Sequence, residues 1–143
     1  MLNAALVALL TVLQPATSAQ PELKGQACTA RELVGTWQLA TPPRTPGTTK
    51  AHKHVTPTHF FVVRFGANDA VLSGHGGTYT VANGTYTETV THGFGPTWSD
   101  MNRGASVPFQ CRLDGDALII VGDLQGQTLS EQWRRVSGPS TQP

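Results

Sequence analysis

Apolar and polar residues alternate in short runs along much of this chain, and turn residues separate the runs at short intervals. Alternation with a period of two places successive side chains on opposite faces of a strand. The runs that predict strands are residues 36–40, 59–65, 77–90, 109–113, 117–121 and 129–136. No stretch of about twelve residues carries an apolar face at helical spacing without a Gly or Pro inside it. The pattern therefore predicts an all-β protein.

Asn83-Gly84 predicts the turn of a β-hairpin, because a type I′ turn needs positive φ at both central residues. This turn pairs Tyr79 with Glu88 across the two strands. The face that suits solvent consists of Thr78, Thr80, Thr85, Thr87, Thr89 and Thr91. The face that suits the interior consists of Tyr79, Val81, Tyr86, Glu88, Val90 and His92.

A second hairpin is predicted to turn at Asp114-Gly115. One of its faces would hold Cys111, Leu113, Leu118 and Ile120. About eight antiparallel strands in sequence order indicate a meander, and such a meander closes into a small up-and-down β-barrel because closure removes the exposed strand edges. Residues 41–51, with three prolines, and residues 92–108 are predicted loops. The second loop is long enough to bind or cover a ligand.

The N-terminus predicts export. Residues 1–19 carry no charged side chain, and an apolar run from Leu6 to Leu13 is followed by Pro15 and by small residues up to Ala19. This is typical of a secretory signal peptide cleaved near Ala19, with the periplasm or the extracellular space as the destination. The alternative is a buried N-terminal helix. The run is too short to span a bilayer, and no later segment is long and apolar enough to do so.

The remaining length fits one domain. We expect an N-terminal extension over residues 20–32, a barrel over 33–136 and a disordered tail over 137–143. The net charge of +1 at pH 7 gives no broad field that favours nucleic acid or acidic partners. In an exported protein the cysteine pair Cys28 and Cys111 predicts a disulfide.

The segment 34–39, "VGTWQL", combines a Gly with a Trp at the head of the first predicted strand. A Trp there fills the tapering end of a small barrel, and Gly35 allows a close approach of the chain as it turns into the strand. The segment resembles the Gly-x-Trp signature of the lipocalin superfamily, in which an Arg of the last strand packs over the Trp. The resemblance implies that Arg134 or Arg135 packs on Trp37.

Further motifs extend this resemblance from Leu33 to about Val136. The segments "THF" at 58–60, "GGTYT" at 76–80 and "YTE" at 86–88 resemble strands of bacterial lipocalin-like proteins of unknown function. The resemblance implies a β-barrel that binds a small apolar ligand, which it does not name.

The predicted strand phases suggest a pocket. If Arg64 points outward, then His59, Phe61, Val63 and Phe65 point inward and join Tyr79, Tyr86 and Glu88. A few polar groups among aromatic side chains are typical of small-ligand pockets, and Trp98 in the long loop would cover the mouth. The alternatives are that Glu88 is held by an Arg or Tyr and only fixes the strands, and that Trp98 only packs.

Two other functions remain open. An inward pair of His59 and Glu88 would be able to transfer protons in an enzyme. No nucleophile elbow, Gly-rich phosphate loop or metal motif supports catalysis, so binding is favoured. In the second alternative, side chains fill the barrel, which then serves as a module that binds or inhibits another protein. His52 and His54 share a strand face, but no further ligand follows at metal-site spacing, so we expect neither a metal nor a cofactor.

Overall fold

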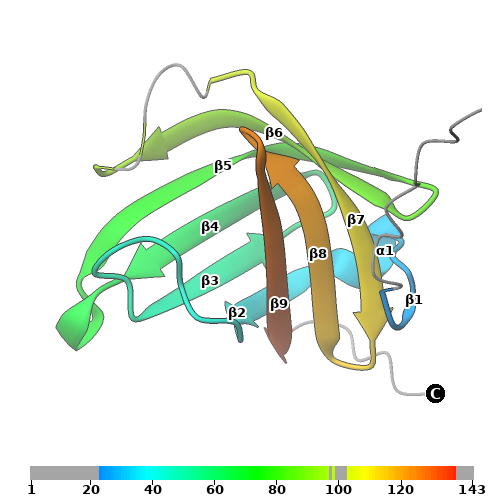
Figure 1. Ribbon diagram of the computed structural model, residues 1–143, viewed down its shortest axis with the longest axis horizontal. Helices are drawn as coiled ribbons and strands as arrows, with labels where there is room; N and C mark the ends of the chain where they lie inside the picture. The colour runs from blue at the N-terminus through cyan, green and yellow to red at the C-terminus, as the bar shows by residue number, and fades with distance from the viewer. Residues whose placement is uncertain (1–22, 97, 99–102, 138–143) are drawn as a thin grey trace, which may run out of the picture.

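The computed structural model describes residues 23–96, 98 and 103–137 and forms a barrel of antiparallel strands (Figure 1). The strands are β1 (Gln26–Ala27), β2 (Gly35–Leu39), β3 (Lys50–Val55), β4 (His59–Phe65), β5 (Val71–Ala82), β6 (Thr85–Phe94), β7 (Ser106–Asp114), β8 (Ala117–Leu124) and β9 (Gln127–Ser137). A short helix α1 (Ala30–Leu33) precedes β2, and a 3-10 turn (Ala67–Asp69) follows β4. The predicted signal peptide over 1–19 and the tail residues 138–143 lie outside the described residues.

The eight strands β2 to β9 pair in sequence order, and β9 returns to β2, so that the sheet closes on itself. The short strand β1 pairs with β7 at Leu113 and Arg112, beyond the point where the β6–β7 pairing ends at Gln110. This arrangement confirms the predicted all-β meander and its closure into an antiparallel barrel. Closure leaves every long strand paired on both sides, as expected for a sheet of this length.

Strand β3 was not among the predicted strands, and it carries an unexpected interior residue. Its burial alternates, with Ala51, Lys53 and Val55 buried. The sequence pattern hid this strand because a Lys occupies a position that should be apolar. The predicted loop over 92–108 is also shorter than expected, since β6 continues to Phe94 and β7 begins at Ser106.

The Asn83-Gly84 hairpin has the predicted turn and pairing. Asn83 has φ 50° and Gly84 has φ 75°, and Tyr79 pairs with Glu88. Tyr79, Tyr86 and Glu88 are buried, as predicted. His92 is exposed, which contradicts the prediction. A β-bulge opposite Gly76 and Gly77 leaves one extra residue on β6. Beyond this bulge, the side chains of β6 that regular alternation would turn inward point outward instead.

The second hairpin turns one position later than predicted. Asp114 pairs with Ala117, which makes Gly115 and Asp116 the two central residues. The predicted face is correct, because its four members, Cys111, Leu113, Leu118 and Ile120, are all buried. The side-chain alternation therefore located this face more reliably than it located the turn.

The predicted phase of β4 was wrong. Phe60 and Val62 are buried, whereas His59 is exposed and Phe61 is only partly buried. The inner face of β4 therefore continues to Arg64, which the sequence placed outside. A guanidinium fits inside because this end of the barrel is hollow, as the next subsection describes. His59 and Phe61 consequently do not face the interior.

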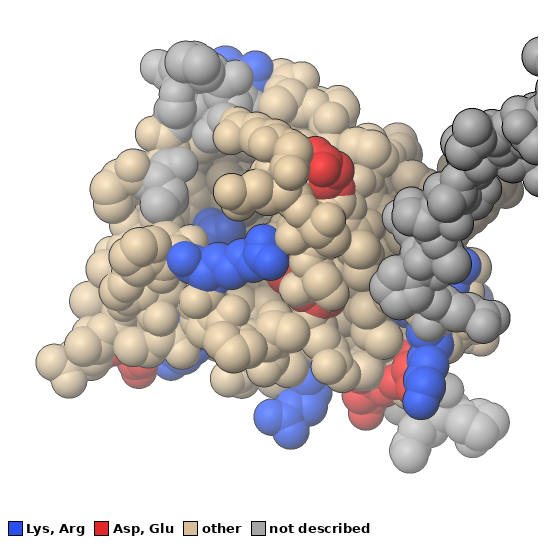
Figure 2. All heavy atoms as spheres, in the orientation of Figure 1, with Lys and Arg blue, Asp and Glu red and all other residues tan. Residues whose placement is uncertain are grey.

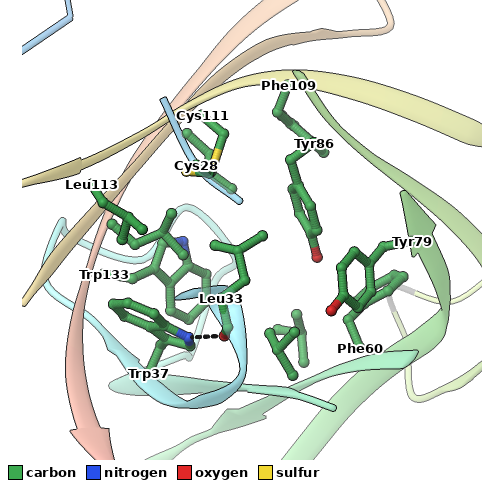
Figure 3. Packing of buried hydrophobic residues seen from close by; sticks show 14 of the residues in the cluster. Cys28, Leu33, Trp37, Phe60, Tyr79, Tyr86, Phe109, Cys111, Leu113 and Trp133 are labelled. Atoms are coloured by element: carbon green, nitrogen blue, oxygen red, sulfur yellow. Dashed lines mark hydrogen bonds between the residues drawn. A yellow bond between two sulfur atoms is a disulfide. The ribbon is translucent and has the colours of Figure 1, made fainter. Parts of the chain in front are cut away.

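Trp37 closes one end of the barrel, together with α1 and the disulfide (Figure 3). The Trp37 side chain is fully buried, and its Nε1 donates a hydrogen bond to the carbonyl of Leu33 at 2.9 Å. The bridge between Cys28 and Cys111 confirms the predicted pairing and ties the N-terminal segment to β7. This end is therefore filled by side chains.

Arg135, rather than the exposed Arg134, packs over Trp37, with its guanidinium 4.0 Å from the ring centroid. The same guanidinium donates to the carbonyls of Val34 at 3.0 Å and Glu32 at 2.6 Å. Gly35 has φ 141°, a conformation that favours glycine, and lets the chain turn from α1 into β2. Both members of the Gly-x-Trp segment thus serve to close the barrel.

Candidate functional site

A cavity of about 540 Å³ opens at the other end of the barrel. The segments that follow β2, β6 and β8 contribute to its rim, including Thr45, Trp98 and Gln125. In an up-and-down barrel these connections all lie at the end opposite the β2 entry that Trp37 fills. Figure 2 shows a hollow in the surface with Lys or Arg side chains at its floor and edge.

The walls of this cavity expose apolar and polar surface in similar amounts. Their apolar side chains come from β4, β6, β7, β8 and β9 and from Trp98, and they include Val62, Val90, Val107, Phe109, Ile120, Leu129 and Trp133. Trp98 lies over Gly93, where a Cβ would come within 2.2 Å of the indole ring. Gly93 therefore makes room for the ring of Trp98 against β6.

Lys53 and Glu88 form an ion pair in the interior. The Lys53 Nζ lies 2.7 Å from Glu88 Oε1, and the two residues are only 2% and 5% exposed. The Tyr86 hydroxyl donates to the same carboxylate oxygen at 2.9 Å. The ammonium also lies 5.0 Å from the ring centroid of Trp133 and 5.3 Å from that of Tyr86. The burial of Lys53 is thus offset by an opposite charge and two aromatic rings, and the burial of Glu88 by the ammonium and the Tyr86 hydroxyl.

The pKa shifts agree with this pairing. Burial alone would raise the pKa of Glu88, but the charge and hydrogen bond of Lys53 outweigh burial and hold the pKa below its ordinary value. Burial, followed by the charge of Glu88, raises the pKa of the Tyr86 hydroxyl. Glu88 is therefore an anion that is already neutralised by Lys53, and Tyr86 donates to it as a neutral phenol.

Arg64 and His75 form a second polar pair on the cavity wall. Arg64 Nη1 lies 3.2 Å from His75 Nδ1. A guanidinium can only donate, so Nδ1 accepts this hydrogen bond and His75 is neutral, with its proton on Nε2. Burial lowers the pKa of His75 to about 4; the charge of Glu88 opposes this shift, and the charges of Arg64 and Lys53 add to it. Burial likewise lowers the pKa of Arg64, which remains a cation.

Glu131 is a further charged residue on the cavity wall, and it lies below the rim. Its Oε2 accepts a hydrogen bond from Trp133 Nε1 at 3.0 Å. Its charge raises the pKa of Arg64, although the two groups form no direct ion pair. With the exposed Asp123, the cavity lining therefore contains two cations and three carboxylates, of which Lys53 and Glu88 are paired directly.

Of the six residues predicted to bind a ligand, Glu88 and Trp98 line the cavity. Tyr79 and Tyr86 are interior but belong to the packed core, where the Tyr79 hydroxyl donates to the carbonyl of Thr56 at 2.8 Å. Phe61 lies on the outer face and stacks on His92 and Phe94. His59 is exposed on the outside, so it does not form the predicted proton-transfer pair with Glu88.

Besides Glu131, sequence reasoning missed Lys53, Arg64 and His75 on the cavity wall. The alternation of Ala51, Lys53 and Val55 was a signal for Lys53, since both of its neighbours on that face are apolar. His75 lies opposite Val62 in the β4–β5 ladder, so the correct phase of β4 would have found it and Arg64 together. The preference of charged residues for solvent concealed all three.

Among the described residues, no group of three or more His, Cys, Asp or Glu side chains is placed to hold a metal ion. Within residues 23–96, 98 and 103–137, no helix has the length and hydropathy of a membrane span. No known family model matches this chain, and no curated protein is similar to it in sequence. The barrel and the geometry of its cavity therefore carry the functional argument.

Proposed function

We propose that this protein is an exported, lipocalin-like barrel that binds a small, mostly apolar ligand in the cavity at its open end. The observation that carries the proposal is a 540 Å³ cavity whose walls combine apolar side chains with polar and charged ones. Cavities of roughly 300–1,000 Å³ are typical of small-molecule sites, in which apolar side chains contact the ligand and polar groups orient it. The filled end supports the same function, since Trp37 and α1 leave the ligand one way in.

The disulfide supports the export part of this proposal. Disulfides persist mainly in the periplasm and outside the cell. The bridge between Cys28 and Cys111 has ordinary geometry, with a Cα–Cα distance of 5.5 Å. The uncharged, apolar segment at residues 1–19 is consistent with the same destination.

Filling the cavity tests the binding function. Leu129 on β9 lines the cavity, so Leu129→Trp would occupy part of the space that a ligand needs. Nile red is a suitable probe because it is apolar, uncharged and brighter in an apolar site. We expect the parent protein to bind the dye and Leu129→Trp to weaken binding by about tenfold or more, which corresponds to about 1.4 kcal/mol.

A matched control separates the cavity from the outer surface. Ile119 on β8 does not line the cavity and is also partly buried, so Ile119→Trp adds the same ring elsewhere. This variant should bind Nile red as the parent does. Failure of the parent to bind the dye, or equal binding by both Trp variants, would show that the cavity is not the site.

A further inference from the structure

We propose that the ligand is an amphipathic carboxylate whose charged end pairs with Arg64 and whose apolar part lies deeper, among Val62, Phe109 and Ile120. This inference rests on the proposed binding function and adds the chemical class of the ligand. It is based on the position of Arg64 on the cavity wall and on the partners of Arg64 among the described residues.

Arg64 lies at the open end of the barrel. It is the penultimate residue of β4, and the connection that follows begins at Gly66. Its side chain lines the cavity, and it points to the same face as Phe60 and Val62. A group bound to this guanidinium would therefore sit near the mouth, where a ligand enters.

The protein occupies only part of the hydrogen-bonding capacity of Arg64. A guanidinium has five N–H donors, and one of them is given to His75 Nδ1. Because His75 is neutral, this bond leaves the charge of Arg64 uncompensated. No carboxylate of the described residues lies within 4.0 Å of the Arg64 nitrogens.

The carboxylates nearby are engaged elsewhere. Glu88 accepts from Lys53 and from Tyr86. Glu131 accepts from Trp133. Their charges reach Arg64 through space but provide no direct partner for its remaining donors. The cavity wall thus presents a partly desolvated cation with donors available to whatever occupies the cavity.

A planar carboxylate suits this arrangement best. It accepts two parallel hydrogen bonds from a guanidinium, and such charge-assisted pairs are stronger than neutral ones. His75 holds one edge of the guanidinium and thereby orients the rest toward the cavity. The apolar side chains of Val62, Phe109 and Ile120 then favour a hydrocarbon tail beside the internally paired Lys53 and Glu88, which gives an amphipathic ligand with one anionic end.

The test compares lauric acid with lauryl alcohol, which share a tail and differ in the charged end. Displacement of Nile red near neutral pH gives the affinity of each. We expect the parent to bind the acid at least about tenfold more tightly than the alcohol. Arg64→Met should remove this preference by weakening the acid about tenfold or more, while the affinity for the alcohol stays within about twofold.

Two further variants make the result specific. Arg134→Met removes an exposed Arg from β9 and should leave both affinities unchanged. Arg64→Gln keeps a donor for His75 without the charge, and should behave like Arg64→Met. Arg64 forms no direct ion pair within the described residues, so neither variant breaks one; both are expected to fold, and thermal melts check this.

The outcomes separate the two proposals. Equal affinity of the parent for acid and alcohol would overturn the carboxylate inference and leave the apolar site intact. The carboxylate inference would also be overturned if Arg64→Gln weakened the binding of lauric acid and of lauryl alcohol equally. If the parent binds neither compound nor Nile red, the proposed binding function itself fails. The preference of the parent needs no variant, so the inference is tested even if the Arg64 variants do not fold.

Discussion

At the residue scale, this barrel keeps charged side chains in places where an apolar core would be simpler. Lys53 and Glu88 are both buried and pair at 2.7 Å. Replacing a buried ion pair with apolar groups is often neutral or stabilising, whereas removing one partner is costly. The pair joins β3 to β6, which agrees with the structural alternative for Glu88, and the ligand contact that we propose is Arg64.

His75 gives the stability of the protein a dependence on pH. Its pKa is about 4 in the folded state, against 6.5 ordinarily, chiefly because of burial. Between these values the unfolded chain binds a proton that the folded chain does not, so the free energy of unfolding falls as the pH drops. Between about pH 7 and pH 5 the loss due to His75 should be about 2 kcal/mol.

Urea unfolding of the parent and His75→Gln at both pH values measures this loss. The variant should be less sensitive to pH, while His59→Gln, on the outside, should behave like the parent. The pKa of Glu88 is lowered in the folded state, so its contribution to stability is lost only as the pH falls below its ordinary pKa of 4.5. That change lies outside the range from pH 7 to pH 5. An equal loss in the parent and His75→Gln would contradict the assignment.

At the scale of elements, close contacts fix how the strands meet. At the bulge between β5 and β6, a Cβ on Gly77 would lie 1.9 Å from the carbonyl oxygen of Thr89, so only glycine fits there. The bulge reverses the faces of β6, which sends His92 outward and leaves Gly93 under Trp98. One glycine therefore decides which side chains reach the mouth of the cavity.

Trp37 should make the largest single contribution to the closed end of the barrel. Trp37→Ala would remove a fully buried ring and the surface on which Arg135 packs. The expected loss is roughly 3–5 kcal/mol, as for other large core truncations. Trp98→Ala should cost less, because Trp98 is only partly buried. Urea midpoints of the two variants give the comparison, and an unchanged midpoint for Trp37→Ala would contradict its role.

At the scale of the whole molecule, the disulfide and the barrel closure act together. The bridge joins Cys28, ahead of the barrel, to Cys111 on β7, and β9 pairs with β2. Contacts between residues far apart in the sequence thus hold the first and last strands of the barrel and the segment that carries Cys28. A bridge that closes so long a loop is worth about 4–5 kcal/mol in the chain-entropy account.

The proposed export makes a prediction about the mature chain. In the native host we expect a protein that begins near Gln20 and has no free thiol, because export would remove the predicted signal peptide and expose the cysteines to oxidation. Intact mass before and after alkylation without reductant measures both features. Alkylation of two cysteines would contradict the disulfide, and a mass that includes residues 1–19 would contradict cleavage.

The sequence by itself determined the strand-rich fold, the Asn83-Gly84 hairpin with its register, and the Cys28–Cys111 pairing. These depend on local alternation, on a turn that needs positive φ, and on there being two cysteines to pair. Tertiary structure decided which face of β4 points inward and which Arg covers Trp37. It also decided that Lys53 and Arg64 are interior, since charged side chains enter a barrel only where partners from distant strands or a hollow space receive them.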